Sequence, residues 1–128
     1  MKLLLDTCTF LWIVGQPQQL PAVILDLYAS PDNEVYLSAA SAWEIAVKYA
    51  RGRLTLAERP ERFVPTQRAK HDILSLPLDE ESSLHMSRLP PLHRDPFDRI
   101  LVGQAIVHGM TILTPDALIT QYPARTMW

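Results

Sequence analysis

Hydrophobic and polar positions divide the chain into short continuous apolar runs and longer runs with apolar residues three or four positions apart. The short runs are typical of buried strands, and the longer runs are typical of amphipathic helices. We expect strands at residues 2–5, 35–37, 73–76 and 111–113, with an edge strand at 124–128. We expect helices at residues 10–14, 21–28, 38–50, 80–89 and 95–108, and another that begins at residue 60. This alternation predicts an α/β fold, a three-layer α/β/α sandwich around a mostly parallel sheet of four or five strands.

The helix expected at residues 95–108 begins in an unusually charged segment, His93-Arg94-Asp95-Pro96-Phe97-Asp98-Arg99. Asp95 and Pro96 are typical of the N-cap and the first helical position, where the missing N–H of proline costs nothing. Asp98 then falls in the first turn, where the helix dipole favours an acid. Helix capping is therefore a sufficient explanation for either acid taken alone.

Length and composition restrict the class of protein. A chain of 128 residues with 48% hydrophobic residues is expected to form one globular domain. The formal net charge is −2, so any nucleic-acid surface must be a local basic patch. The single cysteine, Cys8, rules out an internal disulfide, and we expect it to be a small buried residue. Asp6 interrupts the first apolar run and no run is long enough to span a membrane, so we expect a cytoplasmic protein.

Acidic residues follow several of the expected strands. In a parallel sheet the carboxyl ends of the strands meet at one edge, where ligands bind. The acids at this edge would be Asp6, Glu44, Asp98 and Asp116. Each one alone can be explained by capping, because Ser41 to Glu44 has the spacing of a capping box and Asp116 follows Pro115 as a first-turn acid of a further helix.

Taken together, the four acids favour a cation site over four separate caps. Two carboxylates about 4 Å apart repel by about 4 kcal/mol at an effective dielectric constant of about 20. A divalent cation removes this repulsion, and a ligand set of oxygen atoms suits Mg²⁺ or Mn²⁺. The N-termini of the neighbouring helices would help to hold a phosphate beside the cation.

The remaining patterns give weaker functional signals. The four glycines form no phosphate-binding loop, and the chain has no GxSxG motif. His93 stands out from the other histidines only because it adjoins Asp95 and Asp98, the focal acids at the start of the helix expected at residues 95–108. We expect Trp12 to be a core residue, and we expect the helix at residues 38–50 to bury an apolar face. That face consists of Trp43, Ala46, Val47 and Ala50.

Basic residues cluster shortly after Glu44, with two more near the focal acids. They are Lys48, Arg51 and Arg53, then Arg94 and Arg99. Such a cluster can hold a phosphate backbone. Lys48, Arg51 and Arg53 can equally well be solvent-exposed charges at the C-terminal end of a helix, where basic residues interact favourably with the helix dipole.

Four segments of the chain resemble PIN-domain ribonucleases, and within them the VapC-type toxins of bacterial toxin–antitoxin pairs. They are Leu3-Leu4-Leu5-Asp6-Thr7, Ser41-Ala42-Trp43-Glu44-Ile45-Ala46, His93-Arg94-Asp95-Pro96-Phe97-Asp98-Arg99 and Leu113-Thr114-Pro115-Asp116. The resemblance covers essentially the whole chain, so residues 1–128 would be a single PIN domain. The third segment is the most specific of the four.

This resemblance implies an endoribonuclease that depends on Mg²⁺ or Mn²⁺ and forms a homodimer bound by a cognate antitoxin. The catalytic and metal-binding residues would be Asp6, Glu44, Asp98 and Asp116. Supporting roles would fall to Thr7, Asp95 and Thr114. The candidate residues for RNA binding are Lys48, Arg51, Arg53 and Arg99. We expect the antitoxin to place a basic side chain among the acids and an apolar helix against Leu11 and Trp12, with a purely core role for Trp12 as the alternative.

Two alternatives remain open from the residues themselves. A phosphoryl-accepting receiver domain also places acids and Mg²⁺ at strand ends, but it would need an acidic pair after the first strand, where this chain has only Asp6. A PIN-like module that binds RNA or a partner without cleaving RNA would retain the same acids. Cation-dependent activity separates this second alternative from an enzyme.

Overall fold

The computed structural model describes residues 1–128 and contains one parallel sheet of five strands. The strands are β1 (Lys2–Leu5), β2 (Glu34–Ser38), β3 (Leu74–Leu76), β4 (Thr111–Leu113) and β5 (Arg125–Met127). Their order across the sheet is β3-β2-β1-β4-β5, and every neighbouring pair is parallel. The predicted fold class is confirmed, including the edge strand at the end of the chain.

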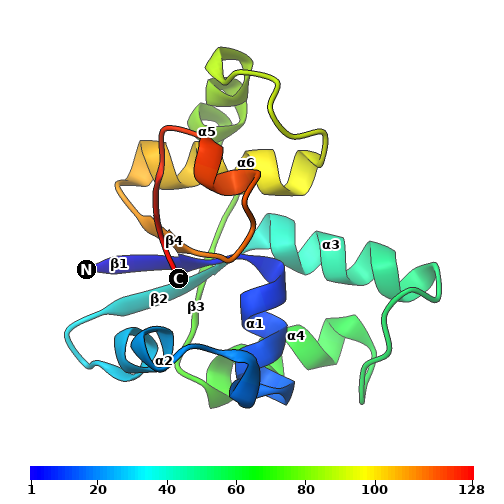
Figure 1. Ribbon diagram of the computed structural model, residues 1–128. Coiled ribbons are helices and arrows are strands. Elements are labelled where there is room, and N and C mark those ends of the chain that lie inside the picture. The colour runs from blue at the N-terminus through cyan, green and yellow to red at the C-terminus, as the bar shows by residue number, and fades with distance from the viewer.

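Helices cover both faces of this sheet. They are α1 (Thr7–Gly15), α2 (Ala22–Ala29), α3 (Ala39–Ala50), α4 (Pro60–Lys70), α5 (Glu80–His85) and α6 (Pro96–His108). Short 3₁₀ helices occur at η1 (Pro17–Gln19), η2 (Met86–Arg88) and η3 (Ile119–Gln121). In Figure 1, α1, α2 and α4 lie on one side of the sheet and α5 and α6 on the other, while α3 extends from the end of β2.

The central strand β1 divides the interior into two hydrophobic cores. Successive side chains of a strand point to opposite faces, so Leu3 and Leu5 join one core and Leu4 joins the other. All three leucines are fully buried. A continuous apolar run is therefore what this position in the sheet requires.

The helix boundaries follow from local chemistry. Asp95 is the N-cap of α6, and its side chain accepts a hydrogen bond from the Phe97 N–H at 2.9 Å, as predicted. Gly109 ends α6 at φ 66°, a left-handed conformation that favours glycine. Gly103 lies where α5 crosses α6, since an added Cβ would be 2.8 Å from the carbonyl oxygen of Ser82.

Two local predictions are wrong. Ser38, rather than Ser41, caps α3, because its hydroxyl accepts from the Ala40 N–H and the helix already begins at Ala39. Ser41 and Glu44 therefore do not form a capping box. No α-helix follows Pro115 either; the chain turns and forms only the 3₁₀ helix η3.

Two burial predictions are also wrong. Cys8 is exposed, because it lies on the side of α1 that faces a surface pocket. The predicted apolar face of α3 is not buried: Trp43 is 58% exposed, Ala50 is exposed, and Ala46 and Val47 are half-buried. The buried residues of this helix are Ala40, Ser41, Glu44 and Ile45.

No helix of the protein is both long enough and apolar enough to cross a membrane.

Candidate active site

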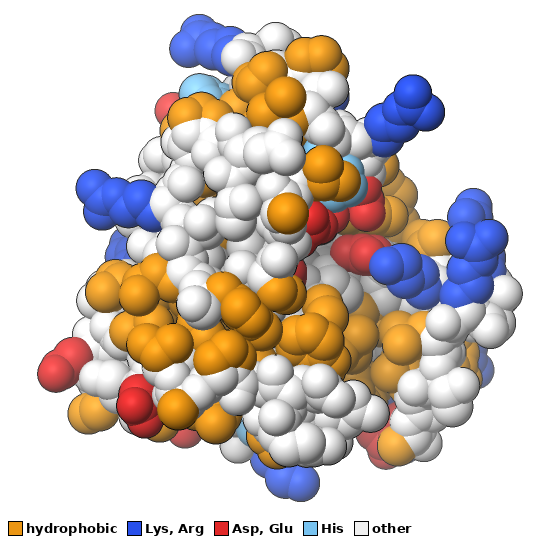
Figure 2. Space-filling model, in the orientation of Figure 1, with side chains coloured by type: hydrophobic (Ala, Val, Ile, Leu, Met, Phe, Trp, Pro, Cys, Tyr) orange, Lys and Arg blue, Asp and Glu red, His pale blue; other side chains and the backbone are white.

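An acidic pocket of about 480 Å³ opens at the carboxyl edge of the sheet. All four predicted acids, Asp6, Glu44, Asp98 and Asp116, line it together with Asp95. Figure 2 shows the acidic side chains in a notch on the surface, with basic side chains beside it. The topology explains this convergence for Asp6, Glu44 and Asp116, because β1, β2 and β4 are adjacent and parallel and the segments that follow them begin at the same edge. Asp98 reaches this edge from the first turn of α6, the helix that leads into β4.

Asp6 is the most firmly held of these acids. It caps α1, and its Oδ1 accepts a 2.7 Å hydrogen bond from the Thr9 N–H. Its Oδ2 accepts one of 2.5 Å from the hydroxyl of Thr114, which follows β4. Burial nevertheless raises the pKa of Asp6 above its usual value, although the bonds from Thr114 and Thr9 oppose the increase.

Glu44 reaches the pocket from α3. Only 4% of the residue is exposed, and two partners satisfy its carboxylate. The hydroxyl of Thr7 donates to Oε1 at 2.6 Å, and Lys48, one turn further along α3, forms an ion pair with Oε2 at 2.5 Å. The predicted supporting residues Thr7 and Thr114 thus each hold one of the predicted catalytic acids.

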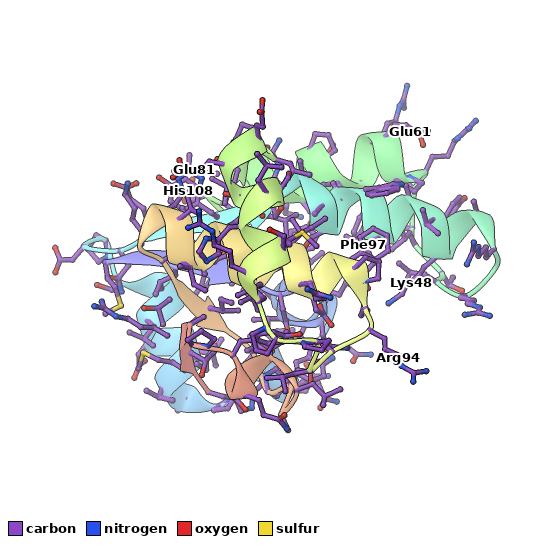
Figure 3. The ribbon with its side chains drawn as sticks, turned by 90° about the horizontal axis from the view of Figure 1, so that it is seen from above. Lys48, Glu61, Glu81, Arg94, Phe97 and His108 are labelled. Carbon is purple, nitrogen blue, oxygen red and sulfur yellow. The ribbon has the colours of Figure 1, made fainter.

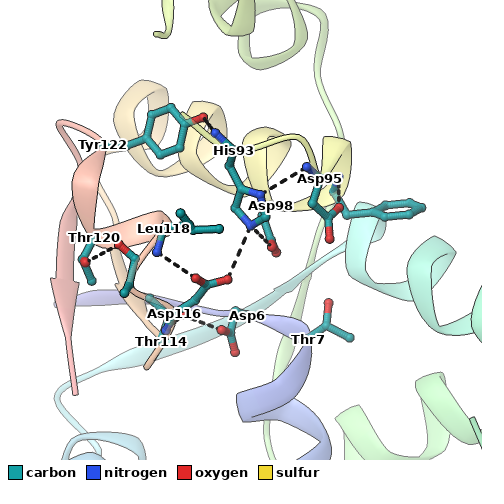
Figure 4. A network of polar contacts seen from close by, with 12 residues as sticks. Asp6, Thr7, His93, Asp95, Asp98, Thr114, Asp116, Leu118, Thr120 and Tyr122 are labelled. Carbon is teal, nitrogen blue, oxygen red and sulfur yellow. Dashed lines mark hydrogen bonds and ion pairs between the residues drawn. The ribbon is translucent and has the colours of Figure 1, made fainter. Parts of the chain in front are cut away.

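Asp98 and Asp116 face each other across the imidazole of His93. Nε2 of His93 lies 2.9 Å from Oδ2 of Asp98 and 3.4 Å from Oδ2 of Asp116. The three side chains are close enough to share one cation (Figure 4). Asp116 is further fixed by the Leu118 N–H, which donates to its Oδ1 at 2.8 Å.

The pocket disfavours additional negative charge. The pKa of Asp98 is raised from 3.8 to about 7, first by burial and then by the charges of Asp95, Glu44 and Asp116, while His93 opposes the increase. Asp95 itself stays at the N-terminus of α6 as the cap. A site of oxygen ligands in which a carboxylate resists ionisation suits a divalent cation such as Mg²⁺ or Mn²⁺.

His93 is a residue of the site to which the sequence alone assigns no role. It lies in the loop before α6, two residues before the N-cap of the helix that carries Asp98. Its place beside the focal acids was visible in the sequence. Its contact with Asp116 was not, because that contact depends on the path of the chain after β4.

The candidate RNA-binding residues separate into two groups. Lys48 and Arg53 line the acidic pocket, and Arg51 is exposed in the turn after α3. Arg99 points elsewhere, since its guanidinium donates to the carbonyl oxygen of Met86 at 3.0 Å. Figure 3 shows Lys48 and Arg94 at the same end of the molecule as Phe97, in the first turn of α6.

The fold and the pocket define a parallel α/β sandwich with an acidic site at the carboxyl edge of its sheet. Residues 3–124 match the PIN domain family, and the chain belongs to that family.

A curated relative is "Ribonuclease VapC16" of Mycobacterium tuberculosis, 38% identical over 53 residues. This match covers 41% of the chain and only 38% of that protein's length.

Solved structures with the same fold include two VapBC complexes. The chain superposes on VapBC2 from Rickettsia felis, bound to a promoter DNA fragment, with a TM-score of 0.75 and 14% identity over 99% of this chain and 98% of that one. DNA-bound VapBC from Salmonella typhimurium gives a TM-score of 0.69 and 17% identity, over 99% of this chain and 97% of that one. FitAcB from Neisseria gonorrhoeae gives a TM-score of 0.60 and 20% identity, over 98% of this chain and 96% of that one.

Proposed function

We propose that this protein is a cation-dependent endoribonuclease that acts as the toxin of a toxin–antitoxin pair. The observation that carries the proposal is the convergence of four carboxylates, from four separate segments of the chain, in one pocket. Membership of the PIN domain family and the similarity to a protein named as a VapC ribonuclease support it.

In this proposal Asp6 and Asp98 hold the cation, and Glu44 and Asp116 complete the site or orient the attacking water. A bound Mg²⁺ or Mn²⁺ supplies Lewis-acid chemistry toward water and the scissile phosphate. The hydrogen bonds from Thr114 and Thr9 fix both oxygens of Asp6, so this carboxylate need not reorganise during the reaction.

Cleavage of single-stranded RNA with Mg²⁺, with Mn²⁺ or with excess EDTA tests the site. We expect Asp6→Asn and Asp98→Asn to lower the cleavage rate about 100-fold or more, the scale of losing one preorganised electrostatic group. Asp79→Asn is the matched control, because Asp79 caps α5 away from the pocket. Activity that persists in EDTA, or that survives either pocket substitution, contradicts the proposal.

The chemistry of the product ends gives a second test. Attack by water should leave a 5′-phosphate on the product. A 2′,3′-cyclic phosphate would mean that the 2′-hydroxyl of the RNA is the nucleophile. If the protein binds RNA and shows no cleavage with any divalent cation, the non-catalytic PIN-like module is the correct interpretation.

Lys48, Arg51 and Arg53 are the proposed contacts to the RNA backbone. Arg53 belongs to the pocket wall, and Lys48 remains 48% exposed although it pairs with Glu44. A strand of RNA that passed these residues would bring a phosphate to the acidic pocket. Arg99 is left out of this group because its guanidinium already bonds the Met86 carbonyl.

A groove of about 590 Å³, lined by both apolar and polar side chains, adjoins the acidic pocket and shares Leu11, Trp12 and Leu54 with it. We propose that the antitoxin lays an apolar helix in this groove and places an Arg or Lys among the acids, because a guanidinium can bond two carboxylate oxygens at once. The toxin itself is proposed to be a homodimer, which light scattering of the free protein would test.

A further inference from the structure

Two hydrogen bonds hold His93 in place, one through its backbone and one through its ring. The His93 backbone N–H donates to the hydroxyl of buried Tyr122 at 2.8 Å. The Asp95 backbone N–H donates to Nδ1 of the ring at 3.2 Å. Figure 4 shows both contacts on the side of the ring away from Asp116. The other ring nitrogen, Nε2, is thereby turned toward Asp98 and Asp116.

The contact with the Asp95 N–H also fixes which ring nitrogen carries the proton. A backbone N–H can only donate, so Nδ1 must present its lone pair to the Asp95 N–H. A neutral imidazole has one proton, which must then be on Nε2. Neither neighbouring carboxylate oxygen is in line with this N–H, and the buried nitrogen has no other hydrogen-bond partner. It is a donor that is not yet satisfied, positioned between two acids.

The distances alone do not separate a cation ligand from a hydrogen-bond donor. Two ligands at right angles, each about 2.1 Å from Mg²⁺ or Mn²⁺, lie about 3 Å apart. Nε2 of His93 and Oδ2 of Asp98 are 2.9 Å apart and would satisfy that geometry. A ligand, however, needs a lone pair on Nε2. The ring proton would then have to be on Nδ1, directly against the Asp95 N–H.

We infer that His93 is a positioning residue and not a cation ligand. Its Nε2 lies 2.9 Å from Oδ2 of Asp98 and 3.4 Å from Oδ2 of Asp116. The partial positive charge of the Nε2–H offsets the repulsion between the two carboxylates, so that both can lie close enough to take part in one cation site. The inference rests on the proposed cation site. Residues that orient metal ligands in this way change metal affinity by about 10- to 100-fold when they are replaced.

Two substitutions test the roles of the two ring nitrogens separately. In His93→Gln the side-chain amide reaches the position of Nε2, so the variant keeps the donor toward the acids and loses the acceptor for Asp95. In His93→Asn the amide reaches only the position of Nδ1, so this variant keeps the acceptor and loses the donor. If His93 only supported the loop before α6, His93→Asn would be the milder change.

The test uses the full chain, freed of metal, with binding of Mn²⁺ followed by electron paramagnetic resonance. We expect His93→Gln to stay within about threefold of the wild-type affinity and His93→Asn to lose about 10- to 100-fold. Thermal melts in EDTA check that both variants fold. Equal losses in the two variants, or a larger loss in His93→Gln, overturn the inference.

A second measurement does not involve the cation. Nitrogen NMR of the histidine side chains in the metal-free protein should show the Nε2–H tautomer for His93, assigned by the signal that is missing in His93→Gln. The opposite tautomer overturns the inference even if Mn²⁺ binds. If wild-type protein binds no Mn²⁺, the proposed cation site is wrong and the positioning role is wrong with it, whatever the tautomer.

Discussion

Removal of one pocket carboxylate should stabilise the metal-free protein. In Asp98→Asn a group of almost the same shape replaces an acid whose pKa is raised from 3.8 to about 7 by burial and by neighbouring negative charges. A carboxyl that resists ionisation in the folded chain ionises freely in the unfolded chain. Its ionisation therefore favours unfolding, and an amide does not carry this penalty.

The size and the pH range of the effect follow from that pKa. A pKa increase from 3.8 to about 7 corresponds to at most about 4 kcal/mol, and solvent screening of the partly exposed pocket reduces the expected gain to about 1–2 kcal/mol. The gain should be small near pH 4, grow as the pH rises toward 7, and stay constant above that. For a domain of this size it corresponds to an increase of about 4–8 °C in Tm.

Calorimetric melts in EDTA at pH 4.5 and pH 8 test this expectation. Asp79→Asn is a control of opposite sign, because hydrogen bonds from Ser82 and His108 lower the pKa of Asp79 and its charge stabilises the fold above its unfolded pKa. Saturating Mg²⁺ should raise the Tm of wild type more than that of Asp98→Asn. An equal Tm gain for Asp98→Asn at both pH values, or no gain at pH 8, would refute the electrostatic argument.

Three further outcomes follow from the structure. Gly103→Ala should destabilise the protein by about 1–2 kcal/mol in urea unfolding, since the new methyl meets the α5 backbone although alanine favours helix. Arg53→Glu, in the pocket wall, should weaken RNA binding and flatten its salt dependence more than Arg51→Glu does. The double variant Asp6→Asn, Asp98→Asn should bind the antitoxin more weakly than wild type, most clearly at low salt; equal affinity would show that no basic side chain enters the pocket.

The sequence predicts best those elements that are determined by burial or by capping alone. A strand buried on both faces must be continuously apolar, which identifies residues 2–5 as β1. The Asp-Pro pair at the start of α6 supplies the N-cap and the first helical residue, which are the positions that these two residue types favour. Parallel topology then brings Asp6, Glu44 and Asp116 together, because the segments that follow parallel strands begin at one edge of the sheet.

Two of the errors have different physical origins. Asp116 was expected to begin a helix, but local hydrogen bonds form a turn instead: its N–H donates to the Thr114 hydroxyl, and the Leu118 N–H donates to its carboxylate. Cys8 was expected to be buried, yet α1 turns it toward the pocket. The exposure of Cys8 does not follow from spacing along the chain, because it depends on which segments face α1 in the folded protein.

The clearest error concerns α3, and it is informative about the site. Hydrophobic periodicity selects the face with Trp43 as the buried one, whereas the protein buries the face with Ser41 and Glu44. A carboxylate can be buried there only because the Thr7 hydroxyl and the Lys48 ammonium satisfy it. The exposed Trp43 ring instead packs edge-on against Phe97, with centroids 5.0 Å apart at 79°. Local patterning fails here because the helix is oriented to present an acid to the pocket, which is where a functional site is expected to override it.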